Sequence, residues 1–369
     1  VCRPDFRHSA AGRLRRMAGF QLVALDTTEL TPEVVAMVEL SAFFRGDGDI
    51  GDMPLDRDVA LDTYIAQISD EGLKADYQAE PGIPEGLMME EFRAQAAAAI
   101  EERCAALGEH YPFSHVAPGV IVRKPIAEVT AVGASYIALQ FYRALHANRV
   151  EIVGPNAETI LARSKQFGRD FANLFECIAG YAVSGRENGV PYMTSTSRSA
   201  QKFRTLLFHL CARIQSGQVK EFEALSPAQK STNDGKVDCF VHVGGLPVDG
   251  ATIIYLVGAT IQKDNIDIKI MDHGKIQSVS DFFNIKPATF HGILVRPCDE
   301  NALTRDKCVQ NRCRLFSYDT IWQNMGKRDG SPYQTRALHR LDRTTRELLK
   351  KFRQAVYQGD YEEFRLDAA

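Results

Sequence analysis

The sequence predicts a mixed fold, α/β or α+β, built from a helix-rich N-terminal region and a second region with a mixed sheet flanked by helices. Short apolar runs bounded by turn residues indicate strands, and longer stretches with helical spacing of apolar residues indicate helices. The chain has 369 residues, which is long for one small domain and fits two or three. Its hydrophobic content of 45% and charged content of 25% are those of a globular protein.

The overall charge gives no sign of a nucleic-acid partner, because the formal net charge is -3. Any binding of DNA must therefore depend on local basic patches. No apolar run reaches about 18 residues, so we expect no membrane span. The eight cysteines include no Cys-x-x-Cys pair, which favours buried thiols in a reducing cytoplasm. A zinc site at the closest pair, Cys308 and Cys313, is the alternative.

Residues 1–150 form the first predicted region. A helix is expected to begin at Thr31-Pro32, because threonine caps a helix and proline suits its first turn. Apolar residues at helical or alternating spacing predict the other elements, which are strands at 20–25, 119–123 and 149–153 and helices at 88–107 and 135–146.

An acidic stretch lies within this region. Residues 46–91 hold thirteen Asp or Glu and two Lys or Arg. Residues 47–52 resemble a calcium loop but lack the acidic residues at the EF-hand spacing. We therefore interpret the stretch as an acidic linker or as a surface that faces a protein partner. It could also block a DNA site by mimicking the charge of DNA.

Residues 156–325 form the second predicted region, which Asn156 opens as a helix N-cap. The first helix, 158–183, is expected to break near Gly168, since an interior glycine costs about 1 kcal/mol relative to alanine. The other expected elements, in order, are a turn at 185–191, a helix at 199–214, strands at 234–243 and 253–263, a helix at 276–283, a strand at 292–297 and a strand followed by a helix within 311–322.

Residues 326–369 are predicted to carry a basic C-terminal helix at 337–357. Nine Lys or Arg stand against three Asp or Glu within 327–353. Arg340 and Arg343 are candidate nucleic-acid-binding residues on this helix. The alternative interpretation is a solvated helix face.

The two strands at 234–243 and 253–263 carry the polar residues that point to chemistry. The first opens on Asp234-Gly235-Lys236-Val237-Asp238, and the second closes on Gln262-Lys263. Such a pair can bring a carboxylate, an oxygen ligand and a lysine to one edge of a sheet. Oxygen ligands of this kind hold Mg²⁺, which activates water and stabilises the charge that develops on a phosphate. A lysine can add positive charge there.

Three segments together resemble restriction-endonuclease-like PD-(D/E)XK nucleases of bacterial anti-phage defence loci. They are the glycine and Phe-Glu pair within 168–176, the strand start at 234–238, and the strand, glycine and Lys-Asn pair within 256–265. A later segment, 311–315, is similar to an Asp-Arg-x-Arg-Leu segment of the same group. The resemblance covers residues 156–325 and leaves residues 1–150 without a counterpart.

The resemblance implies a helical glutamate, a strand-edge aspartate and a glutamate or glutamine followed by lysine on the next strand. In this sequence these are Glu176 and Asp238 as ligands of Mg or Mn, with Gln262 and Lys263 completing the catalytic set. Ile261 stands where an acid is expected, so Gln262 would need a bulge to reach the site. The alternative set is Asp267-Ile268-Lys269, which has the Asp-x-Lys spacing.

Each of these residues also has an ordinary structural interpretation. Asp234 and Asp238 are common turn residues, Glu176 could be a solvated helix residue, and Lys263 could belong to a polar turn. Arg312 and Arg314 are candidates for binding DNA phosphates, or they pair with acids such as Asp319.

The function expected from the sequence is therefore a metal-dependent DNA endonuclease, or a nuclease subunit with a protein partner, in bacterial defence. The alternative is a catalytically inactive scaffold or DNA-binding subunit with the same fold. Motifs of other chemistries are absent from the sequence, including the Gly-x-x-x-x-Gly-Lys-Ser/Thr phosphate loop and the Gly-x-Ser-x-Gly elbow.

Overall fold

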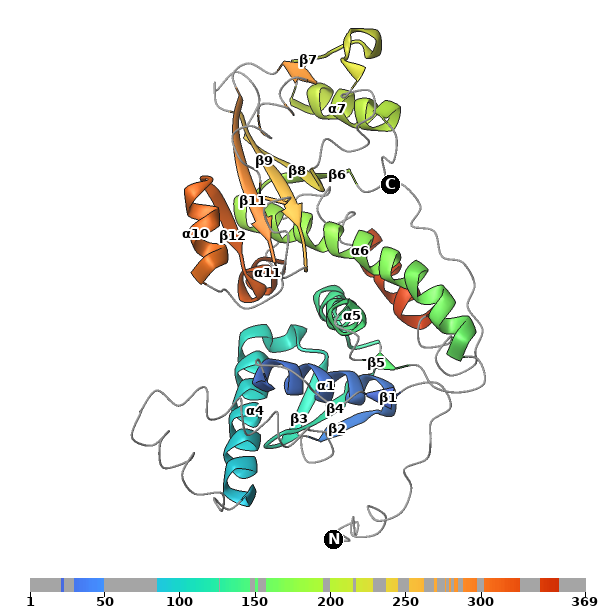
Figure 1. Ribbon diagram of the computed structural model, residues 1–369, viewed down its shortest axis with the longest axis vertical. Helices are drawn as coiled ribbons and strands as arrows, with labels where there is room; N and C mark the ends of the chain where they lie inside the picture. The colour runs from blue at the N-terminus through green and yellow to red at the C-terminus, as the bar shows by residue number, and fades with distance from the viewer. Residues whose placement is uncertain are drawn as a thin grey trace.

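The structure is a computed structural model. It describes residues 21–22, 30–49, 85–125, 127–146, 150–151, 157–194, 200–214, 217–227, 237–244, 252–261, 269–270, 276, 279, 282–284, 288–296, 302–325 and 339–351. The described residues form a mixed α+β structure, as the sequence predicts. A mixed five-stranded sheet occupies one part, and a small antiparallel sheet with helices occupies the other (Figure 1).

The five-stranded sheet has the order β12-β11-β9-β8-β6. Strand β8 runs antiparallel to both of its neighbours, whereas β9, β11 and β12 run parallel to one another. The parallel strands therefore end at the edge of the sheet where β8 begins. The strands are β6 (Val190–Met193), β8 (Cys239–Val243), β9 (Thr252–Ala259), β11 (Ala288–Val295) and β12 (Cys313–Phe316).

Helices cover both faces of this sheet, and the alternation of side chains along each strand decides which residue meets which helix. On one face, Cys239 and Val241 join the hydrophobic cluster of α6 (Ala157–Glu187). On the other face, Phe240 joins the cluster of α7 (Ala200–Ile214). Because both faces are buried, the central strands are nearly continuous apolar runs.

A third, smaller cluster lies beside the parallel strands. Helix α10 (Ala302–Gln310) connects β11 to β12, and Cys308 packs with Leu294, Cys313 and Ile270. This β11-α10-β12 unit is a parallel crossover connection. Figure 1 shows α10 beside β12, followed by the short helix α11 (Tyr318–Met325).

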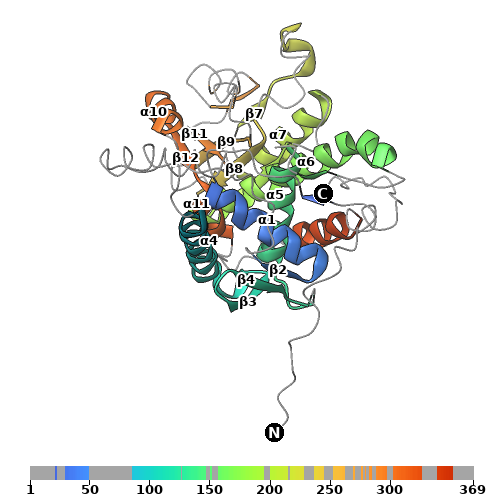
Figure 2. The same ribbon diagram turned by 60° about the horizontal axis from the view of Figure 1, so that its bottom comes forward.

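The N-terminal part is organised around α1 (Leu30–Arg45), which is buried over most of its length. It contacts α4, α5 and the antiparallel sheet of order β2-β4-β3 (Figure 2). Gly48 faces the Val38 carbonyl so closely that a Cβ atom there would collide with it. The elements are β2 (Asp47–Asp49), α4 (Glu85–Leu107), β3 (Phe113–Ala117), β4 (Val120–Arg123) and α5 (Ala131–His146).

Short elements complete the described fold. Two pairs of two-residue strands lie outside the larger sheets, and a helix spans 339–351 within the predicted 337–357. The remaining bounds are β1 (Gln21–Leu22), paired with β5 (Val150–Glu151), β7 (Gln218–Val219), paired with β10 (Phe283–Asn284), and the 3₁₀ turns Gly108–His110 and Phe222–Ala224.

One hydrophobic cluster joins the N-terminal part to the five-stranded sheet. It includes residues of α1, α4, α5, α6, α11 and one face of the sheet. Ring contacts mark the junction: Phe141 stacks on Phe171 with centroids 6.3 Å apart, and Tyr136 meets Trp322 edge-on at 5.2 Å. Helix α5 is thus packed between α1 and α6. The division of the chain at 150–156 remains a prediction from sequence.

Several local expectations differ from the structure. Helix α6 continues through Gly168 without a break, because its packing on the sheet outweighs the small cost of one glycine. The turn expected at 185–191 is present but shorter: α6 ends at Glu187, Asn188 forms the turn with a φ of 53°, and β6 begins at Val190. Pro191 fits within β6 because that strand is at the sheet edge. Of the predicted helix 276–283, Phe283 belongs to a strand instead.

Candidate active site

Asp238 lies immediately before β8, at the edge where the parallel strands end. Its backbone N–H donates to the Val257 carbonyl at 2.9 Å, and its own carbonyl accepts from the Thr194 N–H at 3.1 Å. The side chain is buried, and its Oδ2 accepts from the Ala259 N–H at 2.7 Å. Backbone bonds on both sides therefore fix the carboxylate at the end of β9.

Lys269 is the lysine that the structure places on this carboxylate. Its Nζ lies 2.9 Å from both Oδ1 and Oδ2 of Asp238. The lysine side chain is 32% exposed and the aspartate 6%, so the pair joins a buried carboxylate to the surface. Gln262 and Lys263, as well as Asp234 and Asp267, lie outside the described residues. Lys269 belongs to the alternative set Asp267-Ile268-Lys269.

Glu176 comes from the middle of α6, on the turn that approaches β8. Its neighbours Phe175 and Ile178 are buried, and Glu176 itself is half-buried. One turn further along, a Cβ atom on Gly180 would come within 2.7 Å of the Cys239 Sγ. The absence of a side chain at Gly180 lets α6 lie close to β8, which brings Glu176 toward the residue preceding that strand.

The charges of Glu176 and Asp238 both act on two neighbouring groups, Tyr142 and Cys239. The pKa of Tyr142 is raised to about 12, mainly by burial and to a smaller extent by the negative charges of Glu176 and Asp238. Burial also raises the pKa of the Cys239 thiol well above its usual value, with smaller contributions from Cys177, Asp238 and Glu176. Tyr142 belongs to α5, and its ring lies 6.0 Å from the ring of Phe175, so the N-terminal part borders this region of α6.

The pKa of the Tyr142 phenol depends on the charges of the Glu176 and Asp238 carboxylates. We expect Glu176→Gln to lower the pKa of Tyr142 from about 12 toward its ordinary value of 10, because one of the two negative charges is removed. The pKa is measured by ultraviolet absorbance of the phenolate, as the difference between each protein and its Tyr142→Phe derivative. Glu187→Gln, on the same helix, is the control and should leave the pKa of Tyr142 unchanged.

The same shift predicts a pH dependence of stability. Because the folded pKa of Tyr142 is raised, its contribution to stability is complete below pH 10 and is lost as the pH rises toward 12. Tyr142→Phe should remove this part of the alkaline loss. An unchanged alkaline profile would show that the pKa of Tyr142 is not raised and that the phenol is not buried as described.

Arg314, a predicted DNA-binding residue, is engaged elsewhere. Its Nη1 lies 2.9 Å from Glu187 Oε1, and its guanidinium lies over the Tyr255 ring at 6.0 Å. The Tyr255 hydroxyl donates to Glu187 at 2.7 Å. Glu187 ends α6 eleven residues after Glu176, roughly 16 Å along the helix at 1.5 Å per residue. Arg314 is thus at the C-terminal end of α6, about three helical turns from Glu176.

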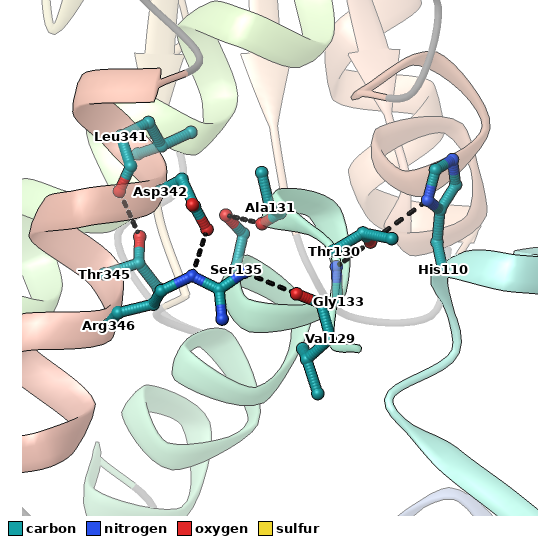
Figure 3. Close-up of polar contacts among 10 residues, drawn as sticks. All are labelled: His110, Val129, Thr130, Ala131, Gly133, Ser135, Leu341, Asp342, Thr345 and Arg346. Carbon is teal, nitrogen blue, oxygen red and sulfur yellow. Dashed lines mark hydrogen bonds and ion pairs between the residues drawn. The ribbon is translucent and has the colours of Figure 1, made fainter. Parts of the chain in front are cut away.

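The other predicted DNA-binding arginines are exposed and lie on separate elements. Arg312 occupies the turn before β12 with a φ of 52°, the left-handed conformation that favours glycine. Arg340 and Arg343 lie on the outer side of helix 339–351. In Figure 3, Arg346 of that helix donates to the Val129 carbonyl and to Asp342, which attaches the helix to the start of α5.

A buried polar cluster in the N-terminal part was not predicted. Glu39 of α1 is 1% exposed and accepts three hydrogen bonds, from Tyr136 at 2.7 Å, from Tyr111 at 2.9 Å and from Arg103 at 3.0 Å. The signal in the sequence was a single acid inside the apolar run of α1. That pattern does not reveal its partners, which are 64 to 97 residues distant.

The cysteines give no disulfide among the described residues. Six of them are thiols, and Cys308 and Cys313 both lie in the apolar cluster beside α10. Within the described ranges, no group of three or more His, Cys, Asp or Glu side chains is arranged to hold a metal ion. In the acidic stretch interpreted from sequence as a linker or partner-facing surface, Asp47 and Asp49 belong to β2.

Comparison of the chain with protein-family models, with curated proteins and with solved structures found no match. Among the helices within the described residues, none is long and apolar enough to cross a membrane.

Proposed function

We propose that this chain is a metal-dependent DNA endonuclease, or the nuclease subunit of a bacterial anti-phage complex. The observation that carries the proposal is the contact of Lys269 with both oxygens of Asp238 at one edge of a mixed sheet flanked by helices. Glu176 lies on α6, the helix that packs closely against β8 at Gly180. A helical glutamate, a strand-edge aspartate and a lysine are the parts that the resemblance to PD-(D/E)XK nucleases implies. No other motif in the sequence supplies a competing chemistry.

The two carboxylates suit Mg²⁺ or Mn²⁺ in number and kind. Mg²⁺ is usually bound by one or two carboxylates, while waters and substrate phosphates complete its shell. A bound ion would lower the pKa of a water molecule and stabilise the charge on the phosphate. Glu176 and Asp238 would hold the ion, and the Ala259 N–H would keep the Asp238 carboxylate oriented.

Lys269 supplies the positive charge in this proposal. Asp238 keeps its ammonium at the edge of the sheet, partly exposed, where a phosphodiester could approach it. The ammonium can orient the attacking water or stabilise the developing negative charge through short N–H···O contacts. DNA is the proposed substrate, and its backbone would follow basic residues such as Arg312, Arg340 and Arg343.

The alternative is an inactive scaffold or DNA-binding subunit of a defence complex. It is favoured by the ion pair itself, because Lys269 contacts both oxygens of Asp238 and the Ala259 N–H contacts one of them. A carboxylate engaged in this way must loosen its contact with Lys269 to bind a metal ion.

Cleavage of supercoiled and linear DNA distinguishes these functions. With Mg²⁺ or Mn²⁺ present, we expect the intact protein to cleave and Asp238→Ala to fall to the level of a protein-free control, because a metal ligand is lost. Cleavage that persists in Asp238→Ala would place the chemistry elsewhere. DNA binding without cleavage by either protein would support the scaffold.

A further inference from the structure

Among the described residues, Arg296 is a buried cation without an anionic partner. It follows β11 directly and is only 3% exposed. Its Nη1 donates to the Thr304 hydroxyl at 2.6 Å, whereas its buried Nε has no hydrogen-bond partner. None of the ion pairs among the described residues includes it. Burial of an unpaired charge is costly, so a guanidinium in this state calls for an anionic partner.

The guanidinium lies at the start of a helix. Thr304 is in the first turn of α10, which has nine residues and no acidic residue in that turn. The unpaired N–H groups and the dipole of a helix N-terminus attract anions. The buried Nε of Arg296 and the first turn of α10 are independent features, and both favour an anionic ligand.

Arg296 also lies at an edge of the sheet where ligands commonly bind in proteins with parallel strands. Arg296 stands at the carboxyl end of a parallel strand, next to the end of β9, where the Thr260 N–H donates to the Val295 carbonyl at 3.1 Å. Ligands of open parallel sheets bind outside this edge. Lys269 lies near it too, since the adjacent Ile270 packs with Leu294 of β11. Two cations thus approach one edge of the sheet.

We infer that Arg296 and the first turn of α10 form a binding site for one phosphate group. A guanidinium binds phosphate through paired N–H groups, and the Thr304 hydroxyl fixes its orientation by accepting from Nη1. The binding of a phosphate here is independent of the proposed endonuclease. The assignment of that phosphate to a DNA backbone, rather than to a small phosphate compound, rests on the proposed function.

The test is calorimetric titration of the full chain with inorganic phosphate at constant ionic strength. We expect one saturable site, and Arg296→Gln should weaken the binding by roughly 10-fold or more, as for the loss of a charge-assisted hydrogen bond. Arg93→Gln is the matched control, because it removes one positive charge from the exposed surface of α4 and should change the affinity less than about 2-fold.

A second variant covers the case in which Arg296→Gln does not fold. Thr304→Val keeps the guanidinium but removes its hydroxyl partner, so it should also weaken phosphate binding. Absence of saturable binding by the unaltered protein would overturn the inference. So would equal affinities of the unaltered protein, Arg296→Gln and Thr304→Val.

A competition experiment identifies the source of the phosphate. If the occupant is a DNA backbone, inorganic phosphate should displace a short duplex and Arg296→Gln should weaken binding of the duplex. If it is a small phosphate compound, only the titration with inorganic phosphate should change. A failure of the chain to cleave DNA would leave the titration result intact, so the two proposals can fail separately.

Discussion

Replacing Glu39 with leucine is expected to lower the free energy of unfolding by about 3–5 kcal/mol, as for the removal of one partner from a buried ion pair. The carboxylate is 1% exposed, and the Arg103 side chain that it pairs with is 14% exposed. Without Glu39, the Arg103 guanidinium loses its carboxylate, and the hydroxyls of Tyr111 and Tyr136 lose an acceptor. Denaturant unfolding followed by circular dichroism measures the change.

Two controls distinguish the loss of the buried ion pair from a general effect of substitution on the free energy of unfolding. Glu102→Leu, at an exposed position on α4, should change the stability by no more than about 0.5 kcal/mol. The double variant Glu39→Leu/Arg103→Leu should be less destabilised than the sum of its single variants, because neither charge remains unpaired. Additive effects in this cycle would show that the two side chains do not interact.

This cluster matters for the site because Tyr136 is on α5, the helix that also carries Tyr142. Glu39 and Arg103 connect α5 to α1 and α4. Loss of the contacts of Glu39 should therefore shift α5 and, with it, Tyr142 beside the candidate site.

Lys269→Met is expected to reduce DNA cleavage by roughly 10²–10³-fold, the loss usual for one group that stabilises developing charge. Lys263→Met should have a much smaller effect. The reason is that Lys269 is the lysine whose Nζ reaches both oxygens of Asp238. The measurement is the single-turnover rate on supercoiled DNA with Mg²⁺, together with DNA affinity for each variant.

The two lysines make a matched pair, because each variant removes the same charge from neighbouring parts of the chain. A loss of cleavage in Lys263→Met with normal cleavage in Lys269→Met would restore the assignment made from sequence. If Lys269→Met lost DNA affinity and cleavage in equal measure, its lysine would be a binding residue rather than part of the chemistry.

Local patterns predicted the elements with strong periodicity. The apolar runs of β8 and β9 and the long helix α6 lie close to where the sequence predicted them. Burial of one or two faces of an element gives its apolar residues a regular spacing, and that spacing is visible within a short stretch of sequence. Elements without such a period were missed. Strand β6 contains Pro191, and only its position at the sheet edge makes that proline compatible with a strand.

The sequence by itself predicted the mixed fold, because apolar runs and helical periods mark the elements locally. Its resemblance to PD-(D/E)XK nucleases made Glu176 and Asp238 candidates. Only the tertiary structure decided which groups meet them. Tyr142 and Lys269 are 34 residues before Glu176 and 31 residues after Asp238, and no local pattern encodes such contacts. The same holds for Arg296, whose burial without an anion among the described residues follows from the packing of α10 on the sheet and not from its neighbours in sequence.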